Sequence, residues 1–425
     1  MSLSPPLPAR LAADLADDFA YAGSKIYLNN ASVSLMPRPG MDAMRDFLLE
    51  YNSVGPDSAL ADELVTKKMQ GVRKIMSGMI SCRPDEIVLT QSTTDGINMV
   101  AGGLGSLREG ASMIIRGMEH EHHANLYPWL RLRDEKNVRI RSLPIDADGF
   151  FEVGELESLM DANTGLVVLS HALYNTGAIL PVEEAGRIIR RNRGSCRSSS
   201  LFFLDAAQTV GCLDAADCDV SRIGCDCMSF NGSKWLCGPM GMGLFYCSRE
   251  AGRLLEPTAV GGESAMLYDG NGGSDREGEA GRRRAVTGRA DIPRLAFKDA
   301  PDKFQTGFRN YVGVAGLEAS LVYLERIGLG RIRATNRNLS GLLLDELGRL
   351  PRVVTYAPAD PKRRTSIVPF NVRGADPRRV VERLERQGIV LAVREMGGLT
   401  MVRASPHFFN TEEQMHALVD ALERL

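Results

Sequence analysis

Between residues 85 and 250, short apolar runs alternate with helix-like stretches, and this alternation constrains the fold more than any other feature. Several of the runs, such as VVL and LFFL, are unbroken, which is typical of parallel strands buried on both faces. Helices are expected between some of them, over Thr94–Leu104 and Val182–Arg191. The pattern predicts an α/β domain with a mostly parallel sheet. Its expected strands are Glu86–Thr90, Ser112–Gly117, Val138–Pro144, Leu166–Ser170, Leu201–Leu204, Cys227–Phe230 and Gly243–Cys247.

The C-terminal part of the sequence has a different pattern. Leu339, Leu342, Leu343 and Leu347 recur at helical spacing and form one apolar face. A strand, a helix and two further strands are then expected, and a last helix begins at Thr411. Their ranges are 366–372, 377–387, 390–394 and 399–404. This predicts a smaller α+β unit after the α/β domain.

Residues 263–302 are rich in Gly, Asp and Arg and show no periodicity, so we expect a loop or an insertion there. The chain is therefore expected to have three parts. Residues 1–26 form an N-terminal segment that packs on the small domain, residues 27–318 form the large domain, and residues 319–425 form the small domain.

The charges of the sequence nearly cancel. It has 51 Lys and Arg residues and 53 Asp and Glu residues, a net charge of −2. Such a chain has no long-range field that attracts nucleic acid or an anionic membrane. No stretch approaches the roughly 18 consecutive apolar residues of a membrane span, and the prolines and aspartates near the N-terminus do not fit a signal peptide. We expect a cytoplasmic protein that binds a small molecule.

The cysteines do not indicate a disulfide scaffold or a metal site. Eight cysteines among 425 residues are too sparse for a disulfide framework. Cys225 and Cys227 form the only tight pair, and no second pair or histidine cluster completes a zinc site. No metal is expected.

Two segments carry chemically reactive residues at the ends of expected strands. In FFLDAAQ (202–208) an apolar strand ends in Asp205, and Gln208 follows it. In FNGSKWLCGP (230–239) another strand leads through a small-residue turn to Lys234. Ligands of open α/β sheets bind beyond the carboxyl ends of the strands, so both segments are expected to face one crevice.

A carboxylate and a lysine are both costly to bury in apolar surroundings. Pyridoxal 5′-phosphate (PLP) satisfies both, because the lysine forms a Schiff base with it and the carboxylate holds its pyridine nitrogen protonated. The spacing alone is equally compatible with Asp205 as a helix N-cap and Lys234 as a surface lysine.

In these and other segments the sequence resembles the class V aminotransferase family of fold type I PLP enzymes. Members include cysteine desulfurases, selenocysteine lyases and isopenicillin N epimerase-like proteins. The resemblance extends from residue 27 to residue 425, and its motifs occur in the family's order. They are YLNNASVSLMP (27–37), TQSTTDGIN (90–98), EHHANLYPW (121–129), LDAAQ (204–208), GSKWLCGPMGMG (232–243), FQTGFRNYVGVAGL (304–317) and VRASPHFFNTEEQ (402–414). The resemblance implies a large domain with a mostly parallel mixed sheet and a smaller α+β C-terminal domain.

The resemblance also implies roles for the residues around the cofactor. Lys234 matches the Schiff-base lysine, Asp205 the partner of the pyridine nitrogen, and Gln208 the donor to the phenolic oxygen. His122 matches the histidine that stacks on the ring and moves protons; outside this context it would be taken for a structural histidine.

Further positions follow for the phosphate and the substrate. Thr93 and Thr94 lie where a strand meets a helix, so their amides and hydroxyls are candidates to bind the phosphate, although an N-cap needs the same geometry. Arg403 matches the arginine that binds the substrate α-carboxylate. Asn30 and Tyr174 are further candidate substrate-binding residues.

The chain departs from the desulfurase pattern at several positions. Ser233 replaces the usual histidine before the lysine, as a candidate cofactor-binding residue, and Tyr174 replaces an asparagine, with Asn175 beside it. The family's segment that reaches the partner subunit's phosphate has Phe308 in place of threonine, followed by Arg309. A homodimer is still expected, with the Arg309 region near the partner's cofactor.

The most informative departure is an absence. Desulfurases carry a loop with a nucleophilic cysteine in the interval that here separates Arg394 from Arg403. That interval is only EMGGLTMV, and no cysteine follows Cys247. Persulfide formation needs a thiolate close to the substrate sulfur, so the usual desulfurase reaction is not expected.

The sequence thus predicts a PLP-dependent enzyme that acts at Cα or Cβ of an amino acid. We favour a C–S lyase that acts by β-elimination on a cysteine-derived substrate. An aminotransferase, an epimerase and a cysteine desulfurase remain alternatives, and so does a PLP-fold scaffold without catalysis.

Overall fold

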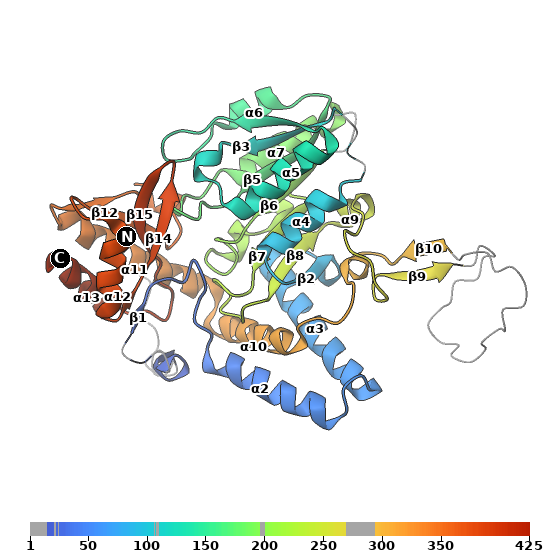
Figure 1. Cartoon of the computed structure of the whole chain (residues 1–425), viewed down its shortest axis with the longest axis horizontal. Coiled ribbons are helices and arrows are strands. Elements are labelled where there is room, and N and C mark those ends of the chain that lie inside the picture. Colours follow the sequence, from blue (N-terminus) through green and yellow to red (C-terminus); the bar gives the residue numbers. More distant parts are fainter. Residues whose placement is uncertain are drawn as a thin grey trace, which may run out of the picture.

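A mixed sheet forms the centre of the larger part of the molecule (Figure 1). The computed structural model describes residues 15–20, 23, 25–105, 107, 110–195, 200–268 and 294–425. Within these residues the sheet has seven strands in the order β2-β8-β7-β6-β5-β3-β4. The strands are β2 (Ile87–Thr90), β3 (Ser112–Arg116), β4 (Arg139–Leu143), β5 (Thr164–Ser170), β6 (Leu201–Asp205), β7 (Cys227–Asn231) and β8 (Gly243–Cys247).

The predicted strands are confirmed to within about two residues at their ends, and so is the mostly parallel sheet. Strands β3 to β7 pair in parallel, and β8 runs antiparallel to both of its neighbours, β2 and β7. Every residue of β2, β3, β5, β6 and β8 is buried, which explains why these strands appear in the sequence as unbroken apolar runs.

Successive residues of each strand enter two different cores, one on each face of the sheet. In β6, Leu201 and Phe203 pack with α4 (Thr93–Gly103) and α5 (Tyr127–Lys136). Phe202 and Leu204 pack on the other face with α3 (Ala59–Ile80), α7 (Val182–Asn192) and α10 (Tyr311–Ile327). Other helices of this part are α2 (Arg38–Ser53), α6 (Val153–Leu159), α8 (Val220–Ile223) and α9 (Arg249–Leu254). Because helices cover both faces of the sheet, a ligand is expected at the ends of its strands.

The C-terminal part is the smaller α+β unit that the sequence predicts. Its antiparallel sheet has the order β11 (Val353–Thr355), β12 (Val368–Val372), β15 (Leu399–Ala404) and β14 (Ala392–Met396). Helices α11 (Leu329–Arg349), α12 (Pro377–Arg386) and α13 (Glu412–Glu423) share one apolar core with it. As expected, Thr411 caps α13, accepting a hydrogen bond from the backbone of Gln414.

The start of the described chain lies against this smaller unit. Strand β1 (Ile26–Tyr27) pairs in parallel with β13 (Ile389–Val390). The ring of Phe19 stacks on Phe409 at 4.1 Å between centroids. The exact boundaries of the three expected parts stay a prediction.

The sequence predicts a loop or an insertion over residues 263–302, and the structure has two strands there that were not predicted. β9 (Ala265–Tyr268) and β10 (Arg294–Phe297) pair antiparallel and project from the body of the molecule (Figure 1). Residues 269–293, between them, lie outside the described residues. The side chains of Leu267 and Leu295 are 63% and 53% exposed, so no buried face marks these strands in the sequence.

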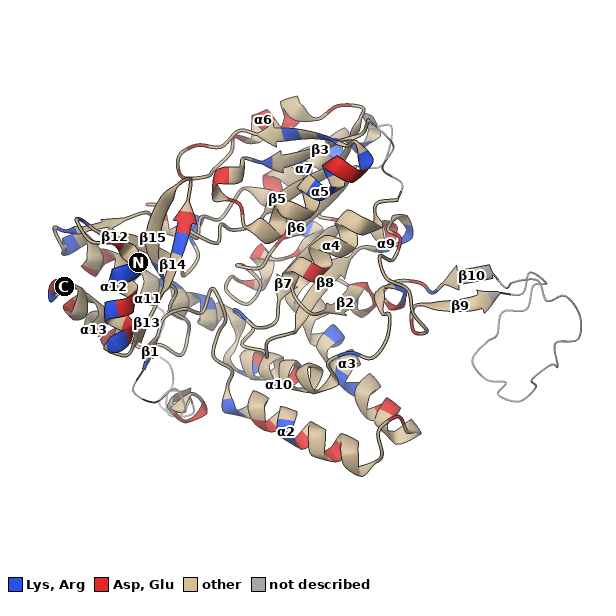
Figure 2. Cartoon of the chain, in the orientation of Figure 1, with Lys and Arg blue, Asp and Glu red and all other residues tan. Residues whose placement is uncertain are grey.

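Charged residues of both signs are spread along the described part of the chain. Lys and Arg residues are interspersed with Asp and Glu residues over both parts of the molecule (Figure 2). No described helix has the length and apolar character that crossing a bilayer requires. No group of three or more potential metal-binding side chains occurs among these residues either.

Candidate active site

A cavity of about 60 Å³ lies where the carboxyl ends of β5 and β6 meet the first turn of α4. Ser170 at the end of β5 is in register with Asp205 at the end of β6, which is in register with Ser229 of β7. This is the edge of the sheet at which the sequence predicts a ligand site. The cavity brings together these residues predicted as site residues: Thr93, Thr94, His122, Tyr174, Asp205, Gln208 and Lys234.

Asp205 is a buried carboxylate that ends strand β6. Its Oδ1 accepts a hydrogen bond of 2.9 Å from the backbone N–H of Ala207. Burial raises the pKa of Asp205 to about 6, and the nearby Glu121 carboxylate adds to the rise. Residues 207–212 form turns, so Asp205 does not cap a helix. A carboxylate in this setting is stabilised by a cationic N–H placed against it.

Lys234 follows β7 and lines the cavity, so the alternative of a surface lysine is wrong. Desolvation lowers the pKa of its amine to about 8, and the positive charges of Arg403 and Arg394 lower it further, while Asp205 opposes them. A substantial share of the amine is therefore neutral near pH 8. A neutral amine is the nucleophilic form of lysine.

The first turn of α4 borders the cavity. Ser92, which was not predicted as a cap, caps this helix by accepting a hydrogen bond from the backbone N–H of Asp95 at 3.1 Å. The alternative of Thr93 or Thr94 as the N-cap is therefore wrong. The Thr93 hydroxyl is buried and has no hydrogen-bond partner among the residues that the structure describes. An anion at this helix N-terminus would satisfy it.

The helix can approach the sheet this closely because Gly96 has no side chain. A Cβ atom at Gly96 would lie 2.4 Å from the Ser229 hydroxyl oxygen of β7. The Ser229 hydroxyl in turn donates to the backbone carbonyl of Thr93 at 2.9 Å. Direct contact between α4 and β7 thus sets the position of Thr93 at the cavity.

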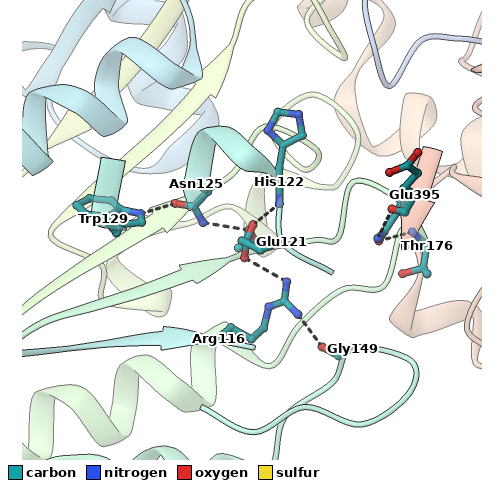
Figure 3. A network of polar contacts seen from close by, with 10 residues as sticks. Arg116, Glu121, His122, Asn125, Trp129, Gly149, Thr176 and Glu395 are labelled. Carbon is teal, nitrogen blue, oxygen red and sulfur yellow. Dashed lines mark hydrogen bonds and ion pairs between the residues drawn. The ribbon is translucent and has the colours of Figure 1, made fainter. Parts of the chain in front are cut away.

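A buried ion pair supports the loop that carries His122 (Figure 3). Arg116, at the end of β3, contacts Glu121 Oε2 at 3.1 Å, and both side chains are almost fully buried. Glu121 Oε1 accepts hydrogen bonds from the backbone N–H of His122 at 2.9 Å and from the Ser170 hydroxyl at 2.7 Å. Asn125 also donates to Ser170, at 3.3 Å. Glu121 and Ser170 line the cavity, and neither of them was predicted from the sequence.

The imidazole of His122 is held in one tautomer. Its Nδ1 accepts a hydrogen bond of 3.1 Å from the backbone N–H of Ala124, so the proton of the neutral ring is on Nε2. Desolvation, aided by the positive charge of Lys234, lowers the pKa of His122 to about 4. The ring of Tyr174 meets the imidazole edge-on, with centroids 4.9 Å apart. At neutral pH His122 is therefore a neutral hydrogen-bond donor through Nε2.

Arg403 lies behind the cavity wall and not in it. Its guanidinium donates to the backbone carbonyl of Tyr174 and to the Ser32 hydroxyl, both at 2.6 Å. Arg394 donates to the same hydroxyl. Among the described residues neither arginine forms a salt bridge with an acidic side chain. Two unneutralised guanidinium groups make this side of the site attractive to a carboxylate.

Two further predicted residues are buried beside the cavity without lining it. Asn30 donates to the backbone carbonyl of Ser405 at 2.8 Å and accepts from the Ser34 hydroxyl at 3.0 Å. Ser233 accepts a hydrogen bond of 2.8 Å at its backbone carbonyl from Ser34. In the structure both residues join the segment around residue 30 to its neighbours.

The interval between Arg394 and Arg403 is a tight hairpin. Met396 of β14 pairs with Leu399 of β15, so only Gly397 and Gly398 connect the strands. Both have positive φ, 52° and 85°, as a two-residue turn of this kind requires. The turn lies on the His122 loop, where the Gly397 N–H donates to the carbonyl of Glu119 at 3.1 Å.

The described cysteines lie outside the lining of the cavity. All seven are free thiols, and none of the residues that line the cavity is a cysteine. Burial raises the pKa of Cys212, Cys218 and Cys237 to about 12. These thiols are therefore poor nucleophiles at neutral pH.

The residues of the cavity fit PLP. The unpartnered Thr93 hydroxyl at the N-terminus of α4 suits its phosphate, and the buried Asp205 carboxylate suits a protonated pyridine nitrogen. Lys234 supplies an amine of lowered pKa for its aldehyde. The Gln208 side chain, which also lines the cavity, has an amide N–H for its phenolic oxygen.

Known proteins resemble the chain over nearly all of its length. The family description Aminotransferase class-V matches residues 26–418. Probable cysteine desulfurases of Methanothermobacter thermautotrophicus and Pyrococcus abyssi are 32% and 28% identical, with 97% and 98% of both chains covered.

Solved structures agree with this relationship. The apo structure of the cysteine desulfurase from Thermococcus onnurineus NA1 is 28% identical and superposes with a TM-score of 0.84, covering 99% of this chain and 98% of the other. The cystine C-S lyase C-DES, 24% identical, shares the fold with a TM-score of 0.81, covering 95% and 98%. The chain belongs to the class V aminotransferase family, and it is a PLP-dependent enzyme of fold type I.

Proposed function

We propose that this enzyme cleaves the C–S bond of a cysteine-derived amino acid by β-elimination. The observation that carries the proposal is a cavity that holds an amine of lowered pKa and an imidazole donor, with no cysteine among the described residues that line it. Relatives named cysteine desulfurase and a cystine C-S lyase of the same fold support a sulfur-bearing substrate. The overall reaction takes a cysteine thioether or disulfide and water, and it gives a thiol or persulfide, pyruvate and ammonium.

The chain's own residues suit each part of this reaction. Bound PLP supplies an electron-accepting ring that makes the Cα proton of an amino acid acidic. Lys234, with its pKa of about 8, takes that proton, and Asp205 keeps the ring nitrogen protonated. His122 donates from Nε2 toward the leaving sulfur, since Ala124 occupies Nδ1.

Binding roles follow from the same geometry. We assign the phosphate to Thr93 and Thr94 at the start of α4. We assign the substrate α-carboxylate to Arg403, which lies behind the cavity wall against the Tyr174 backbone and which no described acidic side chain neutralises. Tyr174 lines the cavity, and its hydroxyl donates to the backbone carbonyl of Glu395 at 3.1 Å.

A desulfurase reaction is the second candidate because of the names of the relatives. It requires a thiolate that takes the sulfur from the substrate. The two-residue turn at Gly397–Gly398 leaves no loop to carry one. The intact set of Lys234, Asp205 and Gln208 around the cavity argues against a scaffold without catalysis.

Product analysis on the PLP-loaded enzyme tests the proposal. Cysteine, cystine and S-alkyl cysteines are supplied in turn, and pyruvate, ammonium, alanine and protein-bound sulfur are measured. We expect pyruvate and ammonium in equal amounts, no alanine, and no product from Lys234→Ala. Stoichiometric alanine together with cyanide-labile sulfur on the protein would establish the desulfurase reaction instead.

We also infer a cytoplasmic homodimer. Phe308, where the family has a phosphate-binding threonine that serves the partner subunit, has a side chain that is 78% exposed. Arg309 beside it is held in its own chain by a hydrogen bond of 2.8 Å to the carbonyl of Phe304. A second subunit that covers Phe308 would bring the Arg309 region close to the partner's cofactor. The free thiols of the described residues suit a reducing compartment.

A further inference from the structure

The carboxamide of Gln208 is held between two groups that each have a single hydrogen-bonding role. The indole N–H of Trp235 donates to Gln208 Oε1 at 3.0 Å. Gln208 Nε2 donates to the backbone carbonyl of Ala31, also at 3.0 Å. An indole nitrogen can only donate and a backbone carbonyl can only accept, so the carboxamide has one orientation.

This orientation decides which group Gln208 presents to the cavity. Its oxygen is turned toward Trp235, and one of the two hydrogens on Nε2 is used by Ala31. The second hydrogen remains for the cavity that Gln208 lines. A reversed carboxamide would present an oxygen, which would repel an anionic oxygen of a bound cofactor.

Trp235 is itself fixed in place. It is fully buried, and its backbone carbonyl lies 3.2 Å from Nε2 of His407. The two rings meet edge to face, with centroids 5.1 Å apart. The turn after Gln208 packs closely against the backbone of Trp235, since a Cβ at Gly211 would lie 2.6 Å from the Trp235 carbonyl oxygen. The indole therefore has no freedom to follow the carboxamide if it rotates.

We propose that Trp235 is a positioning residue that acts through Gln208. It fixes the carboxamide so that an N–H faces the phenolic oxygen of PLP bound to Lys234. The role does not depend on which reaction the enzyme performs, so its test is separate from the product analysis. The competing explanation is that Trp235 only fills space in the small buried cluster with Ala31, Cys212 and Ile367.

The pH dependence of the absorbance of PLP linked to Lys234 separates the two explanations. An N–H on the phenolic oxygen withdraws charge from it, and this weakens its hold on the proton of the linking nitrogen. Loss of the N–H therefore raises the midpoint of the absorbance change. We expect Gln208→Ala to raise it by about 0.5–1 pH unit, the equivalent of one ordinary hydrogen bond. Trp235→Phe should raise it by a smaller amount.

The decisive variant combines both substitutions. If Trp235 acts through Gln208, Trp235→Phe shifts the midpoint in the wild-type background and not in the Gln208→Ala background. An equal shift in both backgrounds would overturn the proposal and leave Trp235 as a packing residue. Trp129→Phe is the control for the loss of a buried indole, because Trp129 donates to Asn125 and not to Gln208.

A second measurement needs no change at Trp235. Hydrogen exchange of the Trp235 indole N–H is followed by NMR in the PLP-free protein. We expect slow exchange in the wild type and exchange at least tenfold faster in Gln208→Ala, where the acceptor is gone. The same rate in both proteins would show that the hydrogen bond is not formed in solution and would overturn the proposal.

Discussion

Lys234 and Asp205 are both less stable as charged groups in this fold than in water. Burial raises the pKa of the Asp205 carboxyl to about 6 and lowers the pKa of the Lys234 amine to about 8. Bound PLP would remove both costs. Its cationic ring nitrogen would stabilise the Asp205 carboxylate, and covalent linkage would remove the charge of Lys234. Without the cofactor, the lysine should lower the stability of the protein.

The first prediction follows from the sign of the Lys234 shift. Because its pKa is about 8 in the fold and 10.5 for a lysine in water, the unfolded chain binds more protons between these values. The loss of stability is complete below pH 8 and disappears as the pH rises toward 10.5. We expect PLP-free Lys234→Met to be more stable than the wild type at pH 7, by on the order of 1 kcal/mol, because solvent still reaches the ammonium.

Urea unfolding of PLP-free protein at pH 7 and pH 9.5 measures this difference. The gain should shrink at the higher pH. Lys67→Met, on the exposed side of α3, is the control for the loss of a lysine away from the cavity. A Lys234→Met protein that is less stable than the wild type at pH 7 would show that the amine has a favourable partner in the PLP-free fold.

Residues at the ends of strands could be predicted from the sequence, whereas their supports could not. Asp205 and Lys234 stand out because Asp205 ends a buried strand and Lys234 follows one. Trp235 and Glu121 act through contacts between segments far apart in the chain, with Gln208 and with Ser170. Each is adjacent to a predicted residue in its motif, but no spacing rule shows which neighbour a side chain will meet.

At the scale of elements, burial decides which strands the sequence reveals. The strands of the central sheet are covered on both faces, and their apolar runs predicted them well. The pair β9 and β10 is held by strand pairing, with Leu267 and Leu295 exposed, and it was missed. A hydrophobic pattern in the sequence reflects contact with a core. The β9–β10 pair projects from the body of the molecule, so the pattern does not predict it.

The turn between β14 and β15 gives the second prediction. Gly398 has φ 85°, a conformation that side chains with a Cβ adopt only at a cost. We expect Gly398→Ala to lower the free energy of unfolding by about 1 kcal/mol. The matched control is Gly341 inside helix α11, where a Cβ would meet nothing within 4 Å. There alanine should raise stability by about 0.5–1 kcal/mol.

Urea unfolding of both variants at one pH compares them directly. A gain in stability from both substitutions would mean that the turn is not in the left-handed conformation in solution. The result bears on function, because this turn lies on the loop that carries His122.

At the scale of the whole molecule, the third prediction concerns assembly. If Phe308 lies in the interface, Phe308→Asp places a charge in an apolar contact and should shift the protein from dimer to monomer, with loss of PLP occupancy. Sedimentation across a range of protein concentrations, together with absorbance of the cofactor, measures both effects. A wild-type protein that sediments as an active monomer with full PLP occupancy would contradict the dimer.

The burial of the cysteines has a consequence for the proposed reaction, which releases thiols or persulfides. A thiol with a pKa of about 12 is ionised in roughly one molecule in 10⁵ at pH 7. Cys82, Cys212, Cys218 and Cys237 all have a pKa of that order. Persulfides, disulfides and alkylating agents react with thiolates, so they react slowly with these cysteines. The thiol or persulfide released by the proposed reaction therefore meets few reactive thiolates in the fold.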